Sequence, residues 1–158
     1  MGQPANDRQP LDPTDLAILD ILQVDARISV SELGRRVGLS QPATSERMKR
    51  LEDRGVISGY AARVNPAALG LDMMAVVRLR TTHDRIAECL SRFQQLPQVL
   101  EVLRLTGEDC FLLKVLVPTP SALETLVDDI GRFGPVTTSL VLRSEPLKPV
   151  SRALLRRG

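Results

Sequence analysis

The sequence is poor in aromatic, cysteine and histidine residues. Aromatic side chains make up 3% of its 158 residues, and tryptophan is absent. So few rings offer little with which to enclose a large flat cofactor. Cys89 and Cys110 are the only cysteines, both lie in apolar segments outside any CxxC pair, and His83 is the only histidine. We therefore predict reduced core thiols, no metal site and no cofactor.

Long hydrophobic runs are missing as well. The stretches "MMAVVRLR" and "CFLLKVLV" are both interrupted by charge, and no secretory signal precedes Asp12. We expect a cytoplasmic protein with no membrane partner. The 43% of hydrophobic residues in a chain of this length can still bury a core, in one ordinary domain or two small ones.

Positive charge is concentrated locally, although the net charge is only +2. Residues 35–54 carry six basic and three acidic side chains. A basic cluster on a helix is often only a solvated face, so the spacing of the residues has to decide its meaning.

The first third of the chain has the start and stop signals of three helices. Asp12 suits an N-cap before a broad apolar face, and Ser29 and Glu32 have the spacing of a capping box. Gly38 is placed to end the second helix in a left-handed conformation, and Ser40 to cap the third. The pattern predicts two short helices joined by a glycine-containing turn, which is a helix-turn-helix.

The third helix is basic on its outside. Thr44, Met48 and Leu51 recur at helical spacing and predict an inward face. A helix of this kind can enter a major groove with its N-terminal residues toward the bases. The predicted DNA-binding residues are Ser40, Gln41, Pro42, Ser45, Glu46, Arg47, Lys49, Arg50 and Arg54.

We assign these residues two kinds of contact. Gln41, Ser45 and Lys49 offer donors or acceptors to base edges, and Glu46 can accept from a cytosine amino group. The arginines at 47, 50 and 54 suit phosphate contacts, or equally ion pairs with Glu46, Glu52 or Asp53. An ordinary three-helix bundle is the alternative; turn, caps and polarity together favour DNA binding.

The second part of the chain has a βαββαβ order. Strand-like segments begin at "MMAVVRLRTT", and the segment "SALETLVDDIGRFG" predicts a helix with Ser121 and Glu124 as its capping box. This order is that of a ferredoxin-like fold, with helices on one face of the sheet. Many strand positions on both faces are apolar, for example Val76 and Leu103. We expect a second copy of the chain to cover the open face.

The predicted fold class is therefore α+β, a helix-turn-helix followed by a ferredoxin-like βαββαβ domain. "GVISGYAARVN" reads as a turn and a short strand, which would add a wing to the helices. The predicted divisions are 1–65 (helix-turn-helix with an N-terminal arm), 66–72 (linker), 73–145 (effector-binding and oligomerisation domain) and 146–158 (basic tail). For the tail, a disordered end, a second DNA contact and a subunit contact through Leu154 and Leu155 all stay open.

Four segments carry a resemblance to a known family. "LDPTDLAILDILQVDARISVSELGRRVGLS" and "ERMKRLEDRGVISGY" resemble the DNA-binding domain of the Lrp/AsnC (feast/famine) transcriptional regulators, and "LTGEDCFLLKV" and "FGPVTTSLVL" resemble their regulatory domain. The resemblance implies a non-enzymatic regulator that binds double-stranded operator DNA. It also implies a dimer or an assembly of dimers, such as a tetramer or octamer, and an amino acid or related metabolite as effector.

The same resemblance implies an effector site. In the family the effector lies near the strand-turn-strand that carries a glycine and an aspartate. The matching positions are Leu105, Thr106, Gly107 and Asp109, together with Thr138 and Ser139 of the last strand. A zwitterion needs donors for its carboxylate and an acceptor for its ammonium group. The alternative is a tight hairpin in which Gly107 supplies a positive φ and Asp109 bonds its own turn.

Two other functions are compatible with this architecture. Siroheme decarboxylases share it, so an enzyme is one alternative, although one histidine and few aromatic residues argue against it. A small-molecule-binding module without DNA function is the other. The basic third helix argues against both.

Overall fold

The computed structural model describes residues 10–155, and these form two compact units. One unit holds the residues up to Ala62 together with those from Pro146, and the other runs from Arg63 to Glu145. Within the described residues no helix is long and apolar enough to cross a membrane. The predicted N-terminal arm at 1–9 and the tail arginines Arg156 and Arg157 lie outside the described residues.

The first unit is built on three helices, α1 (Pro13–Leu22), α2 (Val30–Val37) and α3 (Gln41–Asp53). Their predicted N-caps are confirmed, because side-chain oxygens of Asp12, Ser29 and Ser40 accept from backbone N–H groups three residues later. The core joins all three helices through four buried side chains, Ile18, Leu22, Leu33 and Leu51.

The turn between α2 and α3 has the predicted left-handed glycine. Gly38 has φ 73° and ends α2, and its backbone N–H donates to the carbonyl of Gly34. Gly34 itself lets the two helices approach closely, because a Cβ there would lie 2.7 Å from the carbonyl oxygen of Leu39 and 2.7 Å from Thr44 Oγ1. The predicted helix-turn-helix is therefore formed.

The predicted wing is wrong. Residues 56–65 contain no strand, and the chain runs on to a short 3₁₀ helix, η1 (Pro66–Leu69). A strand needs hydrogen bonds to a neighbour, and the sheet of the described residues contains only strands from the other unit. Among the described residues, the β-forming residues at 56–65 therefore have no strand of their own unit with which to pair.

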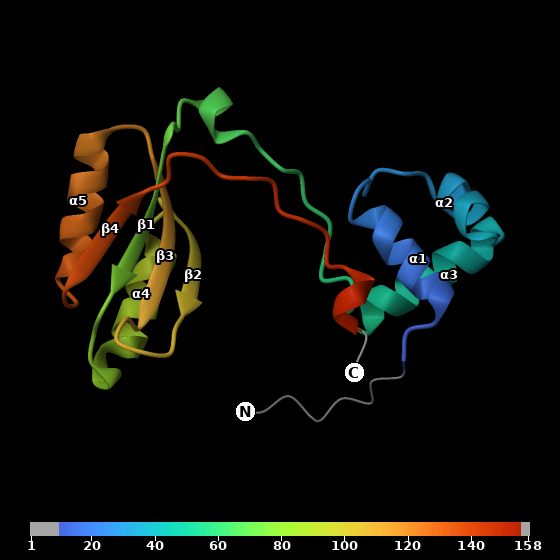
Figure 1. Cartoon of the computed structure of the whole chain (residues 1–158), viewed down its shortest axis with the longest axis horizontal. Helices are drawn as coiled ribbons and strands as arrows, with labels where there is room; N and C mark the ends of the chain where they lie inside the picture. Colours follow the sequence, from blue (N-terminus) through green and yellow to red (C-terminus); the bar gives the residue numbers. More distant parts are fainter. Residues whose placement is uncertain (1–9, 156–158) are drawn as a thin grey trace. The chain divides into compact units, whose positions relative to one another are not determined.

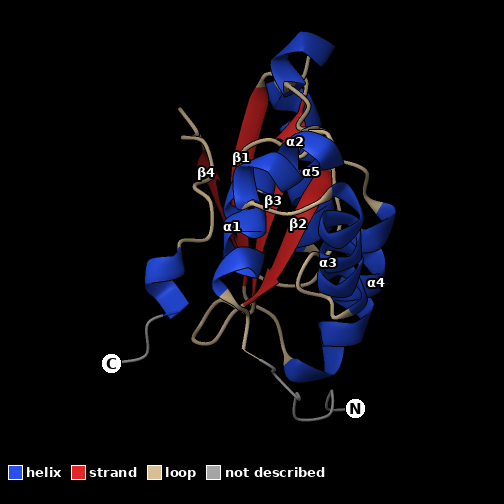
Figure 2. Cartoon of the chain, turned by 90° about the vertical axis from the view of Figure 1, so that its right-hand side faces the viewer, coloured by secondary structure: helices blue, strands red, loops and turns tan. Residues whose placement is uncertain are grey.

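The second unit has the predicted βαββαβ order. Its elements are β1 (Met73–Leu79), a 3₁₀ turn η2 (His83–Arg85), α4 (Ile86–Gln95), β2 (Val99–Arg104), β3 (Phe111–Val117), α5 (Pro120–Gly131) and β4 (Val136–Leu140). The antiparallel sheet has the order β2-β3-β1-β4 (Figure 1). The four strands lie together as one sheet (Figure 2).

The core of this unit lies between the sheet and the two helices α4 and α5. Alternate residues Ala75, Val77 and Leu79 of β1 are fully buried, as a strand with one covered face requires. All three phenylalanines of the sequence meet there: the ring of Phe93 lies edge-on to Phe111 and Phe133, with centroids 5.2 and 6.2 Å away.

The cap of α5 differs from the prediction. The helix begins two residues earlier than Ser121 predicts, because Thr119 Oγ1 accepts from the N–H of Ala122 and Pro120 occupies the first turn. Proline has no N–H to satisfy and its φ suits a first helical position, so the Thr119–Pro120 pair outcompetes the Ser121–Glu124 spacing.

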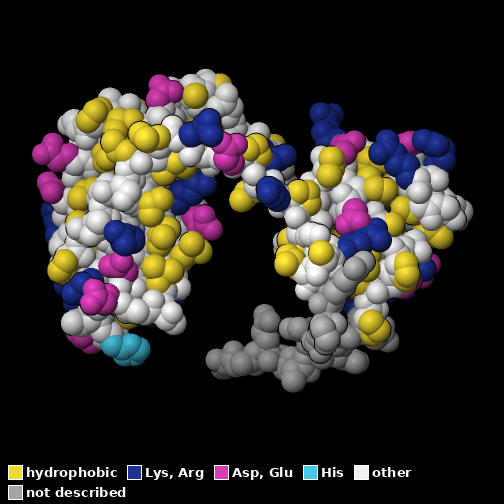
Figure 3. All heavy atoms as spheres, in the orientation of Figure 1, with side chains coloured by type: hydrophobic (Ala, Val, Ile, Leu, Met, Phe, Trp, Pro, Cys, Tyr) yellow, Lys and Arg dark blue, Asp and Glu magenta, His cyan; other side chains and the backbone are white. Residues whose placement is uncertain are grey.

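Large apolar side chains remain exposed on and beside the edge strands of the sheet. Leu103 of β2 is 42% exposed and Leu140 of β4 is 55% exposed. Leu100, at the bulge in β2, is 54% exposed, and Leu142, which follows β4, is 98% exposed. In Figure 3 hydrophobic side chains are visible over the strands between scattered charges. The described unit therefore has apolar surface with no partner of its own.

Candidate DNA-binding and effector sites

Helix α3 presents a polar row along one side. Ser40 begins it as the helix cap, and its hydroxyl accepts from the N–H of Ala43 at 3.4 Å. Thr44 and Leu51 are fully buried on the inward side and fix the rotation of the helix. The predicted DNA-binding side chains that are exposed and for which no ion pair across the unit is found within residues 10–155 are Ser40, Gln41, Pro42, Ser45, Glu46 and Lys49. Three of them, at 41, 45 and 49, recur every fourth residue and therefore line one edge.

Arg47 points the other way, toward α1. Its Nη1 donates to Asp15 Oδ1 at 2.8 Å and also to Asp12, so its side chain is only 25% exposed. The hydrogen bond from Arg47 is the main cause that lowers the pKa of Asp12, and the N–H of Asp15 adds to it. Arg47 therefore joins α3 to α1. Its ion-pair partners are Asp12 and Asp15, and not the acids predicted from the sequence, Glu46, Glu52 or Asp53.

Asp15 is the centre of this cluster and was not predicted as a functional residue. Its side chain is 2% exposed, and besides Arg47 it accepts from Arg50 Nη2 at 3.3 Å. A signal was present in the sequence: Leu11, Asp15, Ile18 and Leu22 are spaced by four, three and four residues, so an acid occupies a core-facing position of α1. Such a buried carboxylate requires cationic partners.

Arg50 and Arg54 lie farther along α3. Arg50 keeps 48% of its side chain exposed although it contacts Asp15, and Arg54 is the exposed C-cap residue of the helix. Lys and Arg side chains are visible along the outside of the helical unit (Figure 3). Both positions leave a guanidinium at the surface of the helical unit.

The loop predicted as the effector site joins β2 to β3. It is closed by the N–H of Leu105, which donates to the carbonyl of Cys110 at 3.0 Å. Gly107 has φ 107°, a conformation that side chains rarely adopt, and a Cβ there would have no atom within 4 Å. The tip of the loop, with Thr106 beside Gly107, is therefore open to its surroundings on the described chain.

Both acids of this loop face arginines of the β1 region. Asp109 Oδ2 lies 3.5 Å from Arg78 Nη1, and Glu108 Oε2 accepts from Arg80 Nη2 at 2.8 Å. These pairs are largely exposed and contribute little to stability. They do place cationic and anionic groups side by side next to an open backbone turn.

Thr138 and Ser139 lie apart from this loop in the strand order. They lie in β4, and two strands, β3 and β1, separate β4 from β2. Thr138 pairs with the buried Val77 and Ser139 with Val76, so the two side chains point to opposite faces of the sheet. Only one of them can face a given ligand on one side of the sheet.

Two family models match the chain. The AsnC-type helix-turn-helix domain matches residues 11–52, and the Lrp/AsnC ligand binding domain matches residues 74–148. The HTH-type transcriptional regulator YezC of Bacillus subtilis is 34% identical over 139 residues, which cover 88% of this chain and 99% of that protein. The chain belongs to the Lrp/AsnC family. Another relative, LrpC of Bacillus subtilis, is 30% identical over 83% of this chain and 91% of its own length.

Solved structures of Lrp/AsnC proteins agree with this fold over nearly the whole chain. The Bacillus subtilis LrpC structure has a TM-score of 0.82 at 29% identity and covers 88% of this chain and 99% of its own. A Neisseria meningitidis regulator in complex with L-methionine has a TM-score of 0.85 at 29% identity, covering 93% and 100%. The Mycobacterium tuberculosis feast or famine regulatory protein with L-methionine has 0.83 at 30% identity, covering 90% and 99%.

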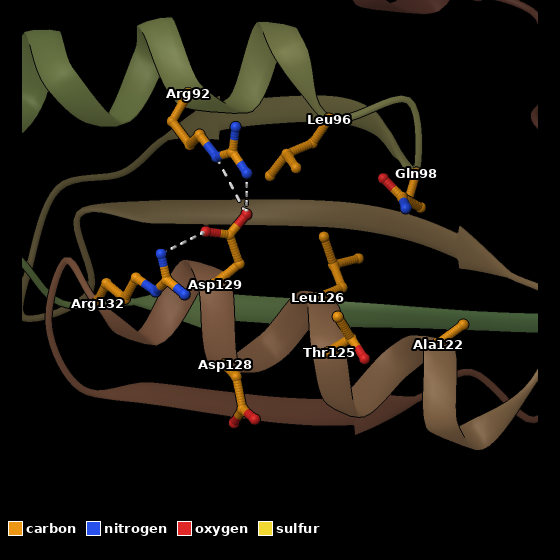
Figure 4. Close-up of a pocket in the computed structure, with 9 residues that line it drawn as sticks. All are labelled: Arg92, Leu96, Gln98, Ala122, Thr125, Leu126, Asp128, Asp129 and Arg132. Atoms are coloured by element: carbon orange, nitrogen blue, oxygen red, sulfur yellow. Dashed lines mark hydrogen bonds and ion pairs between the residues drawn. The ribbon is translucent and has the colours of Figure 1, made fainter.

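A separate pocket of about 640 Å³ lies between α4 and α5 of the ligand binding domain (Figure 4). Arg92 reaches from α4 across to Asp129 of α5, with Nη2 and Oδ2 2.6 Å apart, and Leu96 and Leu126 line the space beside them. The Oε1 atom of Gln98 is buried here without a hydrogen-bond partner among the described residues. Arg92 and Arg132 are both paired with Asp129, and the pocket shares no residue with the predicted effector site.

Proposed function

We propose that this chain is a sequence-specific DNA-binding transcriptional regulator that reads operator DNA with the exposed polar row of α3. The observation that carries the proposal is the orientation of this helix. Buried Thr44 and Leu51 hold one side, the Asp15 cluster holds the adjacent flank, and the edge with Gln41, Ser45 and Lys49 is left exposed. As such a regulator the protein acts in the cytoplasm, on double-stranded DNA.

The roles of the basic residues follow from their surroundings. Lys49 projects from the exposed row and suits a base edge or a phosphate at the groove. Arg50 and Arg54 are exposed and suit phosphates. Arg47 is held by two carboxylates, so we now propose that its main contribution is to orient α3, with any phosphate contact secondary.

Replacing Lys49 with alanine tests the assignment of the row. We expect Lys49→Ala to relax sequence preference by roughly 1–3 kcal/mol at one base position, because a lysine that reads guanine discriminates by about that amount. Arg54→Ala is the comparison, and it should weaken binding to all sequences alike and reduce the salt slope by about one contact. Binding titrations at several salt concentrations measure both. Parent-like behaviour of both variants would show that α3 is not the groove helix.

We propose an amino acid or a related metabolite as the effector, bound at the β2–β3 loop. The support comes from the matched ligand binding domain and from two similar structures that contain L-methionine. Arg78 beside Asp109 offers opposite charges to the two ends of a zwitterion, and the Gly107 turn offers open backbone. Leu105 and Thr106 line the same turn; Thr138 and Ser139 would have to contribute from another copy or from opposite faces.

Changes at this loop should separate ligand response from DNA binding. Gly107→Val disfavours the positive φ and fills the turn, and Asp109→Ala removes an acceptor and also frees Arg78. We expect each variant to bind DNA without ligand as the parent does, but to lose its response to the active amino acid, a coupling of about 1–3 kcal/mol. Calorimetry with a panel of amino acids that begins with L-methionine measures this. A full response in both variants would place the effector site elsewhere.

We propose that the open sheet face and its apolar edges form a contact between copies of the chain, in a dimer that assembles into a tetramer or octamer. Two copies present two recognition helices, which suits a near-palindromic operator. Leu103→Asp should weaken self-association by tenfold or more, because about 1.5 kcal/mol or more of apolar burial is replaced by a buried charge. Leu69→Asp is the control, since Leu69 is exposed in η1 outside the sheet. Sedimentation of both variants measures their self-association. If Leu103→Asp assembles as the parent does, the open sheet face is not the contact between copies.

An enzymatic function remains the second candidate because siroheme decarboxylases share the architecture. Relatives named as transcriptional regulators favour the regulator. An absorption spectrum of the purified protein separates the two, since a bound tetrapyrrole is coloured. A module that binds small molecules without DNA would instead fail the DNA titrations.

A further inference from the structure

The C-terminal segment returns to the helical unit. It follows β4 of the ligand binding domain, yet the residues from Pro146 onward group with α1, α2 and α3. Figure 1 shows its terminal 3₁₀ turn, η3 (Arg152–Leu155), beside those helices. The Lrp/AsnC ligand binding domain match ends at residue 148, so the family match does not cover the contacts described below.

The segment is held by three polar contacts on α1 and its C-cap residue. The backbone N–H of Val150 donates to Gln23 Oε1 at 2.7 Å, and Gln23 Nε2 donates back to the carbonyl of Val150 at 3.3 Å. Arg152 Nε lies 2.5 Å from Asp20 Oδ2. The Gln23 amide thus satisfies both backbone groups of one residue, as a neighbouring strand would, and the ion pair fixes the register two residues later.

The docking positions are on the outside of α1. Asp20 and Gln23 are three residues apart and lie on the same side of the helix end, whereas Ile18 and Leu22 face the core. The contacts join residues more than a hundred positions apart in the sequence. They use neither α3 nor the polar row, so the docked segment leaves the recognition helix available.

Docking changes how far the two units can separate. Through the linker alone, the chain from Ile57, which packs on the core of the helical unit, to Met73 at the start of β1 spans up to about 50 Å, because η1 is not extended. From Leu140 at the end of β4 to the docked Val150 the chain spans at most about 35 Å. The second connection is therefore the shorter one and sets the limit on the separation of the two units.

We propose that the outer side of α1, with Asp20 and Gln23, is a docking site for residues 146–155 of the same chain, and that the docked segment is a second tether between the ligand binding and DNA-binding domains. The basic tail is then a structural connection with a defined partner surface. It restricts the range of positions that the recognition helix can reach relative to the effector domain.

Amide hydrogen exchange on the full-length protein tests the docking directly. In the parent the Val150 amide should exchange about threefold to tenfold more slowly than in Gln23→Ala, because the variant loses both hydrogen bonds to Val150, including the one that its N–H donates. Asp20→Arg and Arg152→Asp should each speed the exchange, and the double variant that exchanges the charges should restore slow exchange. Lys148→Ala is the control, since the described structure shows no ion pair from Lys148 to α1. Equal exchange in the parent and Gln23→Ala would overturn the proposal.

A mixed assembly tests whether the tail binds its own chain. Chains carrying Asp20→Arg are co-expressed with chains carrying Arg152→Asp under different affinity tags. Within each chain the contact then joins like charges, whereas between chains both opposite-charge pairs can form. Fast Val150 exchange in the mixed assembly supports docking within one chain. Recovery of slow exchange would show that the tail binds a second copy and overturn that assignment.

The spacing between operator half-sites tests the tether itself. This experiment rests on the proposed DNA-binding function. Parent and Arg152→Asp protein are titrated with duplexes whose half-sites are separated by different numbers of base pairs. The parent should bind tightly only over a narrow range of half-site spacings. Arg152→Asp should bind over a wider range, and its affinities for the different spacings should differ at least threefold less than those of the parent. Identical spacing profiles would overturn the tether while hydrogen exchange still reports on docking. Absence of any DNA binding would contradict the regulator proposal instead.

Discussion

Replacement of Asp15 by alanine is expected to destabilise the helical unit by about 2–4 kcal/mol. The Asp15 carboxylate is 2% exposed and binds Arg47 and Arg50 of α3. Without it, the partly buried Arg47 guanidinium loses one of its two acceptors, and α1 loses its polar connection to the recognition helix. Arg47 keeps Asp12, so the loss should stay below that of a fully buried, unpaired charge.

Urea unfolding followed by circular dichroism measures this loss. Asp15→Asn keeps the shape and one acceptor but removes the charge, so its unfolding free energy should lie between those of alanine and the parent. Asp53→Ala is the control, because Asp53 is an exposed acid at the end of α3 and its removal should change stability by about 0.5 kcal/mol or less. An Asp15→Ala midpoint equal to that of the parent would show that the cluster contributes nothing to the packing of α3.

The second large effect is expected at Gly134 of the ligand binding domain. Gly134 has φ 148°, and a Cβ there would lie 2.1 Å from the carbonyl oxygen of Arg80. The surrounding backbone is fixed by two hydrogen bonds, from Arg80 N–H to the carbonyl of Pro135 and from Thr81 Oγ1 to the carbonyl of Phe133. Gly134→Ala must therefore move main-chain atoms at the end of β1. We expect a loss of about 3 kcal/mol or more.

Gly131 provides the matched control three residues earlier. It ends α5, and a Cβ there would meet only Val136 Cγ2 at 3.9 Å, an ordinary contact. Gly131→Ala should be neutral or stabilise by up to about 1 kcal/mol, because alanine restricts the unfolded chain and favours a helix. Thermal unfolding compares the two variants. A Gly134→Ala protein as stable as Gly131→Ala would contradict the described packing of this turn.

Local signals predicted the elements of this fold well. Asp12, Ser29 and Ser40 cap their helices as expected, because a cap depends on residues within one turn. The βαββαβ order and the covering of one sheet face by the helices were also predicted, from the order of the elements along the chain. The error at α5 was a competition between two adjacent local signals, won by Thr119 with Pro120.

Contacts between distant segments were not predictable in the same way. The helical period places Arg47 on a flank of α3, but it does not reveal that Asp15, 32 residues earlier, lies opposite. The same holds for Gln23 and Val150 at the tail. The strand expected at 56–65 failed for a related reason, because β propensity is realised only where a partner strand is available.

The two candidate sites also differ in how far the sequence could predict them. The exposed row of α3 could be deduced from spacing, since the buried residues of a helix determine which of its sides remain exposed. The effector residues came from a motif, and the sheet order places Thr138 and Ser139 of β4 two strands from β2 and one strand from β3. Spacing along the chain carries no information about that separation.

Selection of bound duplexes from a random DNA library tests the central claim most directly. The parent protein and a variant with Gln41, Ser45 and Lys49 all changed to alanine are incubated with the library at about physiological salt, and the bound fractions are sequenced. The parent should enrich a near-palindromic motif whose half-sites are about one helical turn apart, and the variant should lose the enrichment while it keeps weak, salt-sensitive binding. Parent-bound DNA with the composition of the input library would contradict sequence-specific recognition by α3.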